Sequence, residues 1–177
     1  MNMGSRWSRE RFMEALMIEA NLLRTLEEKV AIEEAQFDDL PAIIAIDSDL
    51  TGIPKPEIWY GYYAPVMTGA QRTFMVARHE GAVVGYVVGE VRAWEFGSPP
   101  CGWLFAIGVR KDVRLAGIGT LLFNALQARF RRLGVQTMRT MLHIDDHLLI
   151  SFFRSHGMTA GPFIELEMGI APVPSDT

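Results

Sequence analysis

The chain has 177 residues, of which 49% are hydrophobic and 21% are charged, and its formal net charge at pH 7 is −4. Length and composition are those of one globular domain with a full core, and they exclude a membrane span, because no apolar run is long enough. A single cysteine, Cys101, excludes an internal disulfide, and the charges near the N-terminus exclude the uncharged core of a signal peptide. We therefore expect a cytoplasmic protein.

The first half of the chain carries both helical and strand-like patterns. Apolar residues of segment 7–29 recur at three- and four-residue steps, which is typical of a helix. Asp38 or Asp39 can cap a second helix that has Pro41 in its first turn. The turn Glu80–Gly81 separates two strand-like runs and predicts a hairpin. The expected elements are helices over 7–29, from 40 onward and over 57–67, and strands over 30–36, 73–79 and 82–94.

The second half alternates strands with helices, which predicts a mixed α/β sheet with helices on both faces. Its expected elements are a strand over 102–110, a helix over 117–133 that ends at Gly134, a strand over 135–143, a helix from Asp145 or Asp146 to Ser155, and a last strand over 163–170. We expect a helical extension over 1–29, a domain over 30–171 and a tail over 172–177. The extension packs on its own domain or forms a homodimer, and the sequence leaves both open.

The turn Arg114–Thr120 is the feature that says most about function. An Arg-x-x-Gly-x-Gly turn that opens a helix exposes backbone N–H groups at the positive end of the helix dipole, which suits a phosphate. No lysine follows Gly119, so the turn is not a nucleoside-triphosphate loop. Leu122 stands where a dinucleotide site needs a third glycine.

Three segments in order resemble the GNAT superfamily of N-acetyltransferases. Leu104–Leu122 is similar to the acetyl-coenzyme A signature of that family, Phe74–Tyr86 to the hairpin before it, and Asp145–Met158 to its penultimate helix and turn. The resemblance covers about residues 30–170. It implies a central sheet of six to seven strands that is splayed between its fourth and fifth strands. It also implies transfer of an acetyl group from acetyl-coenzyme A to a primary amine of a small molecule or a peptide by direct attack.

The resemblance also implies the cofactor-binding residues. They lie on the strand before the turn, in the turn itself and on the penultimate helix: Ile107, Gly108, Val109, Arg114, Leu115, Ala116, Gly117, Ile118, Gly119, Thr120, Asp146 and Phe153. Asp146 stands where relatives commonly have asparagine. Phe153 stands where many relatives have a tyrosine that protonates the leaving thiolate, so no general acid is assigned.

The general base is open as well. Glu90 and His143 are the candidates, but we favour simpler explanations for both, a solvated strand glutamate and a histidine bonded to a backbone carbonyl. A water chain, or an acceptor that is neutral near pH 7, would need neither residue. Trp59, Tyr60 and Tyr63 are candidates for an aromatic wall of the acceptor site, with core packing as the alternative.

Charge and ligand patterns exclude two further classes. Residues 110–139 hold seven basic residues against one acid, but the patch is short and lacks interleaved aromatic residues, so nucleic-acid binding is not expected. The run His143–His147 offers metal ligands, but helix capping explains its carboxylates, and we expect no metal. The departure at Phe153 leaves a second hypothesis, a non-catalytic module that keeps the fold and binds a partner through residues 1–29.

Overall fold

The computed structural model describes residues 11–18, 30–67, 72–92 and 97–170. Residues 1–140 and 141–177 form two compact units, which are considered one at a time. The described part of the first unit holds a sheet and the helices on it, and the second unit holds one helix. The predicted division into an extension, a domain over 30–171 and a tail stays a prediction.

The sheet has five strands in the order β1-β2-β3-β4-β5. Neighbours from β1 to β4 run antiparallel, whereas β5 runs parallel to β4. Glu80 and Gly81 join β2 to β3 with φ values of 49° and 80°, the left-handed pair that a two-residue hairpin turn needs. The strands are β1 (Val30–Glu34), β2 (Arg72–His79), β3 (Ala82–Arg92), β4 (Cys101–Val109) and β5 (Met138–Arg139).

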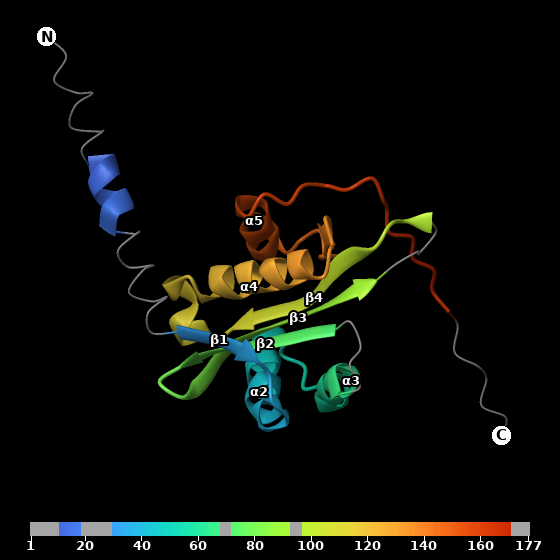
Figure 1. Ribbon diagram of the computed structural model, residues 1–177, viewed down its shortest axis with the longest axis horizontal. Coiled ribbons are helices and arrows are strands. Elements are labelled where there is room, and N and C mark those ends of the chain that lie inside the picture. The colour runs from blue at the N-terminus through green and yellow to red at the C-terminus, as the bar shows by residue number, and fades with distance from the viewer. Residues whose placement is uncertain (1–10, 19–29, 68–71, 93–96, 171–177) are drawn as a thin grey trace, which may run out of the picture. The chain divides into compact units, whose positions relative to one another are not determined.

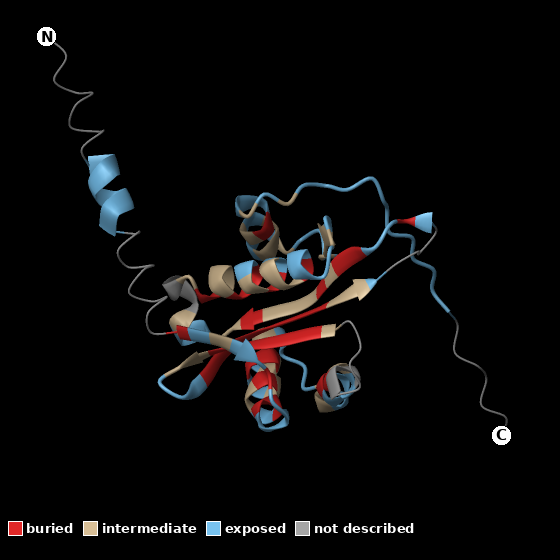
Figure 2. Ribbon diagram, viewed as in Figure 1, coloured by how far each residue is buried: buried red, intermediate tan, exposed pale blue. Residues whose placement is uncertain are grey.

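Helices cover both faces of this sheet (Figure 1). On one face lie α2 (Leu40–Thr51) and α3 (Pro56–Met67), and on the other lies α4 (Ile118–Arg132). Short 3-10 turns, η1 (Phe37–Asp39) and η3 (Lys111–Ala116), precede α2 and α4. Figure 2 shows that burial is concentrated in β2, β3 and the sheet-facing sides of the helices. The core on the α2 and α3 face includes Leu40, Ile43, Ile46, Trp59, Tyr63, Phe74, Val76, Tyr86 and Val88.

Glycines on the opposite face allow α4 to lie close to the sheet. A Cβ on Gly85 would lie 3.0 Å from a methyl group of Leu122, and one on Gly89 would lie 2.7 Å from the ring of Phe130. A Cβ on Gly102 would also overlap that ring. Since real Cβ atoms do not come this close to other atoms, the bulk at this interface must come from the helix. The glycines therefore fix how near α4, and its N-terminus, approaches β4.

The fold class is confirmed as a mixed α/β sheet flanked by helices, and the splay between β4 and β5 is present. These two strands pair only through Gly102 with Met138 and Trp103 with Arg139. The predicted strand count of six to seven is wrong for the described residues, which form five strands. The strand expected over 135–143 is reduced to two residues, because pairing with β4 stops at Arg139.

The strand predicted over 163–170 is absent from the described structure. These residues alternate apolar and polar, but alternation fixes only which side chains share a face, and a strand also needs a neighbour for its backbone hydrogen bonds. Ile164, Leu166, Met168 and Ile170 are each more than four-fifths exposed. The prediction of a strand from this alternation is therefore wrong for the described residues.

The second unit contains α5 (His147–Ser155), capped by Asp146, whose Oδ1 accepts the backbone N–H of Leu149 at 3.1 Å. Gly157 follows the helix with φ 83°. Of the predicted N-terminal helix, residues 11–18 are helical and exposed, and the rest lies outside the described residues. Among the described helices, none has the length and apolar character required to cross a bilayer.

Candidate active site

One edge of β4 is open beyond Trp103. Its other edge pairs with β3 from Cys101 to Val109 except at Phe105, whereas on the β5 side no strand of the described structure pairs with Phe105–Val109. A side-chain bond from the Thr140 hydroxyl to the Leu104 carbonyl, 3.0 Å long, marks where the two strands part. The predicted cofactor residues Ile107 and Gly108 lie on this stretch, and Val109 ends the strand. An extended ligand with amide groups can bond such an edge as a further strand would.

A β-bulge interrupts β4 at Phe105. Val88 pairs with Ala106 and Gly89 pairs with Leu104, so Phe105 has no partner on β3. The bulge turns Phe105 and Ala106 toward the same side, where both pack against the α2 and α3 core. Because a bulge removes a residue from the ladder and re-aims its neighbours, this is a place where backbone groups can serve a ligand. No residue type marks it, and the sequence alone did not predict it.

The open edge leads into the glycine turn. Gly117 has φ 73°, a left-handed conformation that favours glycine, and α4 begins at the next residue. The first backbone bond of the helix runs from the Leu121 N–H to the Gly117 carbonyl at 3.1 Å. The amides of Ile118 and Gly119 therefore lie ahead of the helical bonding pattern, at the positive end of the helix dipole. The predicted site residues Arg114, Leu115 and Ala116 form the η3 backbone, and their side chains lie outside the described structure.

Two basic residues next to the turn already have partners. Arg110 donates to both oxygens of Asp112, at 2.9 and 2.7 Å. This hydrogen-bonded pair raises the pKa of Arg110 and lowers the pKa of Asp112. The Lys111 ammonium donates to the carbonyl of Asp49 at 2.7 Å and lies 3.1 Å from its carboxylate. Lys111 thus connects the turn to the last residues of α2.

Glu90, one of the two base candidates, is paired across the sheet with Arg72. The Arg72 Nε–H donates to Glu90 Oε2 at 2.8 Å, and one Nη group donates to the same oxygen. The guanidinium also lies over the rings of Tyr62 and Phe105, 5.4 and 5.8 Å from their centroids. Both of these bonds hold the Glu90 carboxylate against Arg72, so a structural ion pair accounts for this side chain. A role in catalysis stays a prediction.

His143 and the two acids after it lie in the second unit. The His143 side chain is 76% exposed, and its Nδ1 accepts the backbone N–H of Asp145 at 3.2 Å. In the neutral ring this bond places the proton on Nε2. The nitrogen with the lone pair is then Nδ1, which already accepts the N–H of Asp145. Asp146 uses Oδ1 as a helix cap, and Phe153 is buried with its ring against Phe152. The described residues contain no group of His, Cys, Asp and Glu that could hold a metal.

The predicted acceptor aromatics divide between core and surface. Trp59 and Tyr63 are buried, whereas Tyr60 is 42% exposed and lies against Phe37. Tyr62, which is on the same helix, stacks on Phe105 at the bulge, with centroids 6.0 Å apart and planes at 5°. The helix therefore brings Tyr62 to β4 and Trp59 into the core. Whether any of these side chains contacts an acceptor stays a prediction.

Sequence reasoning missed Asp47. This carboxylate is buried on α2 and accepts hydrogen bonds from the Trp59 indole and the Tyr86 hydroxyl, and Lys55 forms an ion pair with it. Burial, followed by the charge and hydrogen bond of Asp47, raises the pKa of Tyr86. A signal was present, because Asp47 is seven residues after Leu40 and four after Ile43, on the apolar stripe of its helix. An acid on such a stripe requires buried partners.

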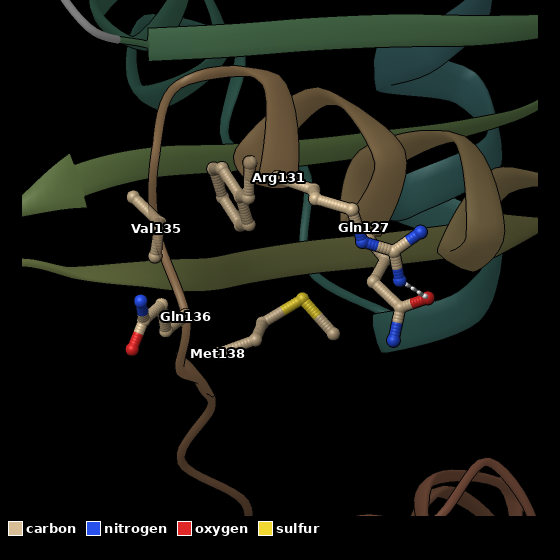
Figure 3. Close-up of a pocket in the computed structure, with 6 residues that line it drawn as sticks. Gln127, Arg131, Val135, Gln136 and Met138 are labelled. Atoms are coloured by element: carbon tan, nitrogen blue, oxygen red, sulfur yellow. Dashed lines mark hydrogen bonds between the residues drawn. The ribbon is translucent and has the colours of Figure 1, made fainter.

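A shallow pocket lies at the other end of α4 (Figure 3). It has a volume of about 330 Å³. Its lining residues come from the end of α4, the segment after it and β5, and they are Gln127, Phe130, Arg131, Val135, Gln136 and Met138. Since α4 has 15 residues, this pocket is about 20 Å along the helix from Gly117. It holds no nucleophile and no acid, so it does not belong to the site at the turn.

Comparisons with known proteins identify the family and the fold. The family model described as "Acetyltransferase (GNAT) family" matches residues 32–158. A search of curated proteins finds no match. A possible acetyltransferase from Clostridium difficile 630 is 18% identical with a TM-score of 0.69, over 81% of this chain and 99% of that one.

Two solved aminoglycoside acetyltransferases have the same fold. AAC(6')-Iy, in complex with the bisubstrate analogue CoA-S-monomethyl-acetylneamine, is 14% identical with a TM-score of 0.70, over 80% of this chain and 99% of that one. The enzyme meta-AAC0020 from an uncultured soil metagenomic sample, in complex with sisomicin, is 19% identical with a TM-score of 0.67, over 83% and 99%. At these identities the likeness to solved structures establishes the fold.

Proposed function

The chain belongs to the GNAT family of acetyltransferases, and from this premise we propose that it transfers the acetyl group of acetyl-coenzyme A to a primary amine of a small molecule or a peptide. The observation that carries the proposal is a continuous backbone surface. The edge of β4 from Phe105 to Gly108, which no strand of the described structure pairs on the β5 side, leads through η3 to the left-handed Gly117 and the first amides of α4.

The residues of this surface fit the parts of acetyl-coenzyme A. The amides of Ile118 and Gly119 would hold the diphosphate, and the helix dipole would add to its binding. The backbone edge at Ile107 and Gly108, which no strand of the described structure pairs on the β5 side, would bond the amide groups of the pantetheine arm, with Val109 next to it. Bound there, acetyl-coenzyme A supplies an acyl thioester and a thiolate leaving group. Contacts with Asp146 and Phe153 remain part of the proposal on the family resemblance alone.

Alignment and charge stabilisation are the tasks left to the protein. A neutral amine attacks the thioester directly, so the protein must hold the two substrates together and offer a donor to the developing oxyanion. The bulge at Phe105 favours a backbone N–H of this part of β4 for that donor. The proposal needs no dedicated general acid, since a thiol with a pKa of about 8.5 leaves readily.

An amine acceptor is supported by charge as well as by the neighbours named above. Residues 30–67, which form β1, η1, α2 and α3, hold seven acids and one base. Four of these acids, Glu33, Asp39, Asp47 and Asp49, form ion pairs with basic residues, so the segment offers a moderate excess of negative charge to a cationic amine. Two of the solved neighbours are named as aminoglycoside acetyltransferases, which supports a small-molecule amine of this general kind.

Gly117→Glu tests the cofactor site. The new carboxylate would stand at the amides of α4 and repel the diphosphate, so we expect acetyl-coenzyme A affinity to fall at least about tenfold in calorimetry. Gly134→Glu is the matched control, because Gly134 also has a left-handed φ of 78° and follows the other end of α4. The control variant carries the same backbone strain and the same added charge, and it should bind acetyl-coenzyme A as tightly as the natural chain does. Equal affinities in the two variants would place the phosphate site elsewhere.

One observation favours a second function. Phe153 has no proton to give, which fits a module that keeps the fold and acts through a partner. Free thiol release across a panel of amines separates the two functions. Acetyl-coenzyme A binding without turnover on any amine would favour the module.

Phe153→Tyr sharpens the distinction. If the chain is an acetyltransferase that needs no acid, the variant should change kcat by less than about threefold, because thiolate departure is not limiting. Turnover that appears only in the variant would mean that the natural chain is inactive because Phe153 lacks the tyrosine hydroxyl. The measurement is kcat with saturating acetyl-coenzyme A and a reactive primary amine.

A further inference from the structure

Asp47 holds an ammonium group that belongs to the chain itself. The Trp59 indole N–H donates to Oδ2 at 3.0 Å, and the Tyr86 hydroxyl donates to Oδ1 at 3.1 Å. The ammonium of Lys55 lies 3.2 Å from Oδ2. The carboxylate is 5% exposed, so a single buried charge is bonded by two neutral donors and one cation.

This group of side chains has the chemistry of a site for primary ammonium ions. A carboxylate supplies the opposite charge, and the rings of Trp59 and Tyr86 stand beside it with centroids 4.8 Å apart at an angle of 74°. Both rings turn their polar edges, the indole N–H and the phenol O–H, toward the carboxylate. In the structure the ammonium of Lys55 takes the place of such a ligand.

The Lys55 ammonium can move away from the Asp47 carboxylate. Its side chain is 32% exposed, and it lies on the loop between α2 and α3. The lysine stem is flexible, so the ammonium can move into water without a change in the fold. When it does, Trp59 and Tyr86 still donate to the carboxylate. Lys55 is also the only base among residues 30–67, so removing its charge leaves that segment wholly acidic.

The ammonium site is next to the strand that would hold the thioester. The ring of Tyr86 packs against Gly108 of β4 so closely that a Cβ on Gly108 would lie 2.6 Å from a ring carbon. Only the side chain of Tyr86 therefore separates Asp47 from the backbone of Gly108. A molecule bound at Asp47 would reach that strand by passing the ring of Tyr86.

We propose that the acceptor is a diamine or polyamine that displaces Lys55 and anchors one ammonium group at Asp47. This inference rests on the acetyl transfer proposed above. An ammonium beside a carboxylate keeps its proton and has no lone pair for attack, so the anchoring nitrogen is not the nucleophile. A second, unprotonated nitrogen forms the new C–N bond while the thioester C–S bond breaks, and the proton of that nitrogen passes to the departing thiolate.

Binding tests the site without requiring turnover. Lys55→Met removes the internal competitor, so butane-1,4-diamine should bind the full-length variant about tenfold more tightly than the natural chain, because a site occupied by its own side chain binds only through its free fraction. The gain should persist in about 0.5 M NaCl, which screens surface charges. Butan-1-ol, which has no charge, should bind neither protein.

Matched variants separate the site from net charge. Lys55→Arg keeps a cation opposite Asp47 and should bind the diamine no better than the natural chain. Glu57→Gln alters an exposed acid two residues away and should leave diamine affinity unchanged. In Lys55→Met combined with Asp47→Asn the gain should vanish. Thermal unfolding of each variant checks that it is folded.

Turnover tests the role of the anchored group. Lys55→Met should raise the ratio of kcat/KM for butane-1,4-diamine to kcat/KM for butan-1-amine about tenfold, because only the diamine has a nitrogen left to react. The inference is overturned if Lys55→Met leaves the kcat/KM ratio or the diamine affinity unchanged. It is also overturned if the gain in diamine affinity persists when Asp47→Asn is added. Neither result contradicts acetyl transfer. A gain in diamine affinity in a protein that acetylates no amine overturns the proposed function instead.

Discussion

Tyr86 places a phenol beside a buried carboxylate, and this has a consequence for stability at high pH. Burial and the neighbouring Asp47 raise the pKa of Tyr86, so the folded chain keeps this proton at a pH where the unfolded chain, with a tyrosine pKa of about 10, has lost it. The folded state then binds more protons than the unfolded state. The contribution of Tyr86 to stability is therefore full below about pH 9 and declines above about pH 10, by up to about 1.4 kcal/mol per pH unit.

Tyr86→Phe should remove that decline. The ring under Gly108 remains, but there is no proton to lose, so the loss of stability between pH 9.5 and 11 should be smaller in the variant than in the natural chain by about 1 kcal/mol. Urea unfolding at several pH values measures the difference. At pH 7 the variant should be less stable by about 1 kcal/mol, because Asp47 loses a donor. If the free energy of unfolding falls equally with pH in the two proteins above pH 9.5, a group other than Tyr86 causes the pH dependence.

At the scale of residues, local features could be read from the sequence and distant partners could not. The turn at Gly117 depends on glycines at a fixed spacing, and the cap of α5 depends on an acid before an apolar run, so neighbouring residues suffice for both. The bond between Tyr86 and Asp47 joins positions 39 residues apart, and the pair of Arg72 and Glu90 joins positions 18 apart. Only the strand register and the packing of α2 bring these groups together.

At the scale of elements, α4 depends on the glycines beneath it. Gly89→Ala would bring a methyl group within 2.7 Å of the Phe130 ring and 2.8 Å of the Trp103 carbonyl oxygen. We expect this overpacking to lower the free energy of unfolding by about 1 to 3 kcal/mol. Because α4 must move away from the sheet, acetyl-coenzyme A affinity should fall too.

Gly61→Ala is the control for that change. Gly61 lies inside α3, and nothing is within 4 Å of the position that its Cβ would take. The same substitution should stabilise the chain there by about 0.5 to 1 kcal/mol, because alanine favours the helix. Urea unfolding measures both variants. Destabilisation of similar size in both variants would show that close packing of α4 on Gly89 is not the cause of the loss in stability.

Strands and helices differed in how well they could be predicted. The helices from α2 to α5 were located because their signals, apolar stripes and caps, lie within each segment. The strands over 135–143 and 163–170 were overestimated, because a strand is completed only by its neighbour. Met138 and Arg139 pair with β4, and the alternating residues Ile164–Ile170 do so with no strand of the described structure.

At the scale of the whole molecule, the N-terminal extension is the segment that the acetyltransferase domain leaves unexplained. Among its described residues, Phe12, Met13, Leu16, Met17 and Ile18 are each at least 44% exposed. We propose that this apolar helix joins two copies of the chain. Removing residues 1–28 should then reduce the mass in solution from that of a dimer to that of a monomer, measured by light scattering. An unchanged mass rules out the dimer role and leaves packing on its own domain.

Lys111 connects the glycine turn of the proposed coenzyme site to α2, the helix of the proposed acceptor site. It stands at the start of η3, yet it is bonded to the carbonyl and carboxylate of Asp49 at the end of α2, the helix that also carries Asp47. A diphosphate that attracts this ammonium releases the end of α2. By linkage, whatever factor this changes in acceptor affinity must appear equally in coenzyme affinity. Lys111→Met should remove this coupling and make the two affinities independent of each other.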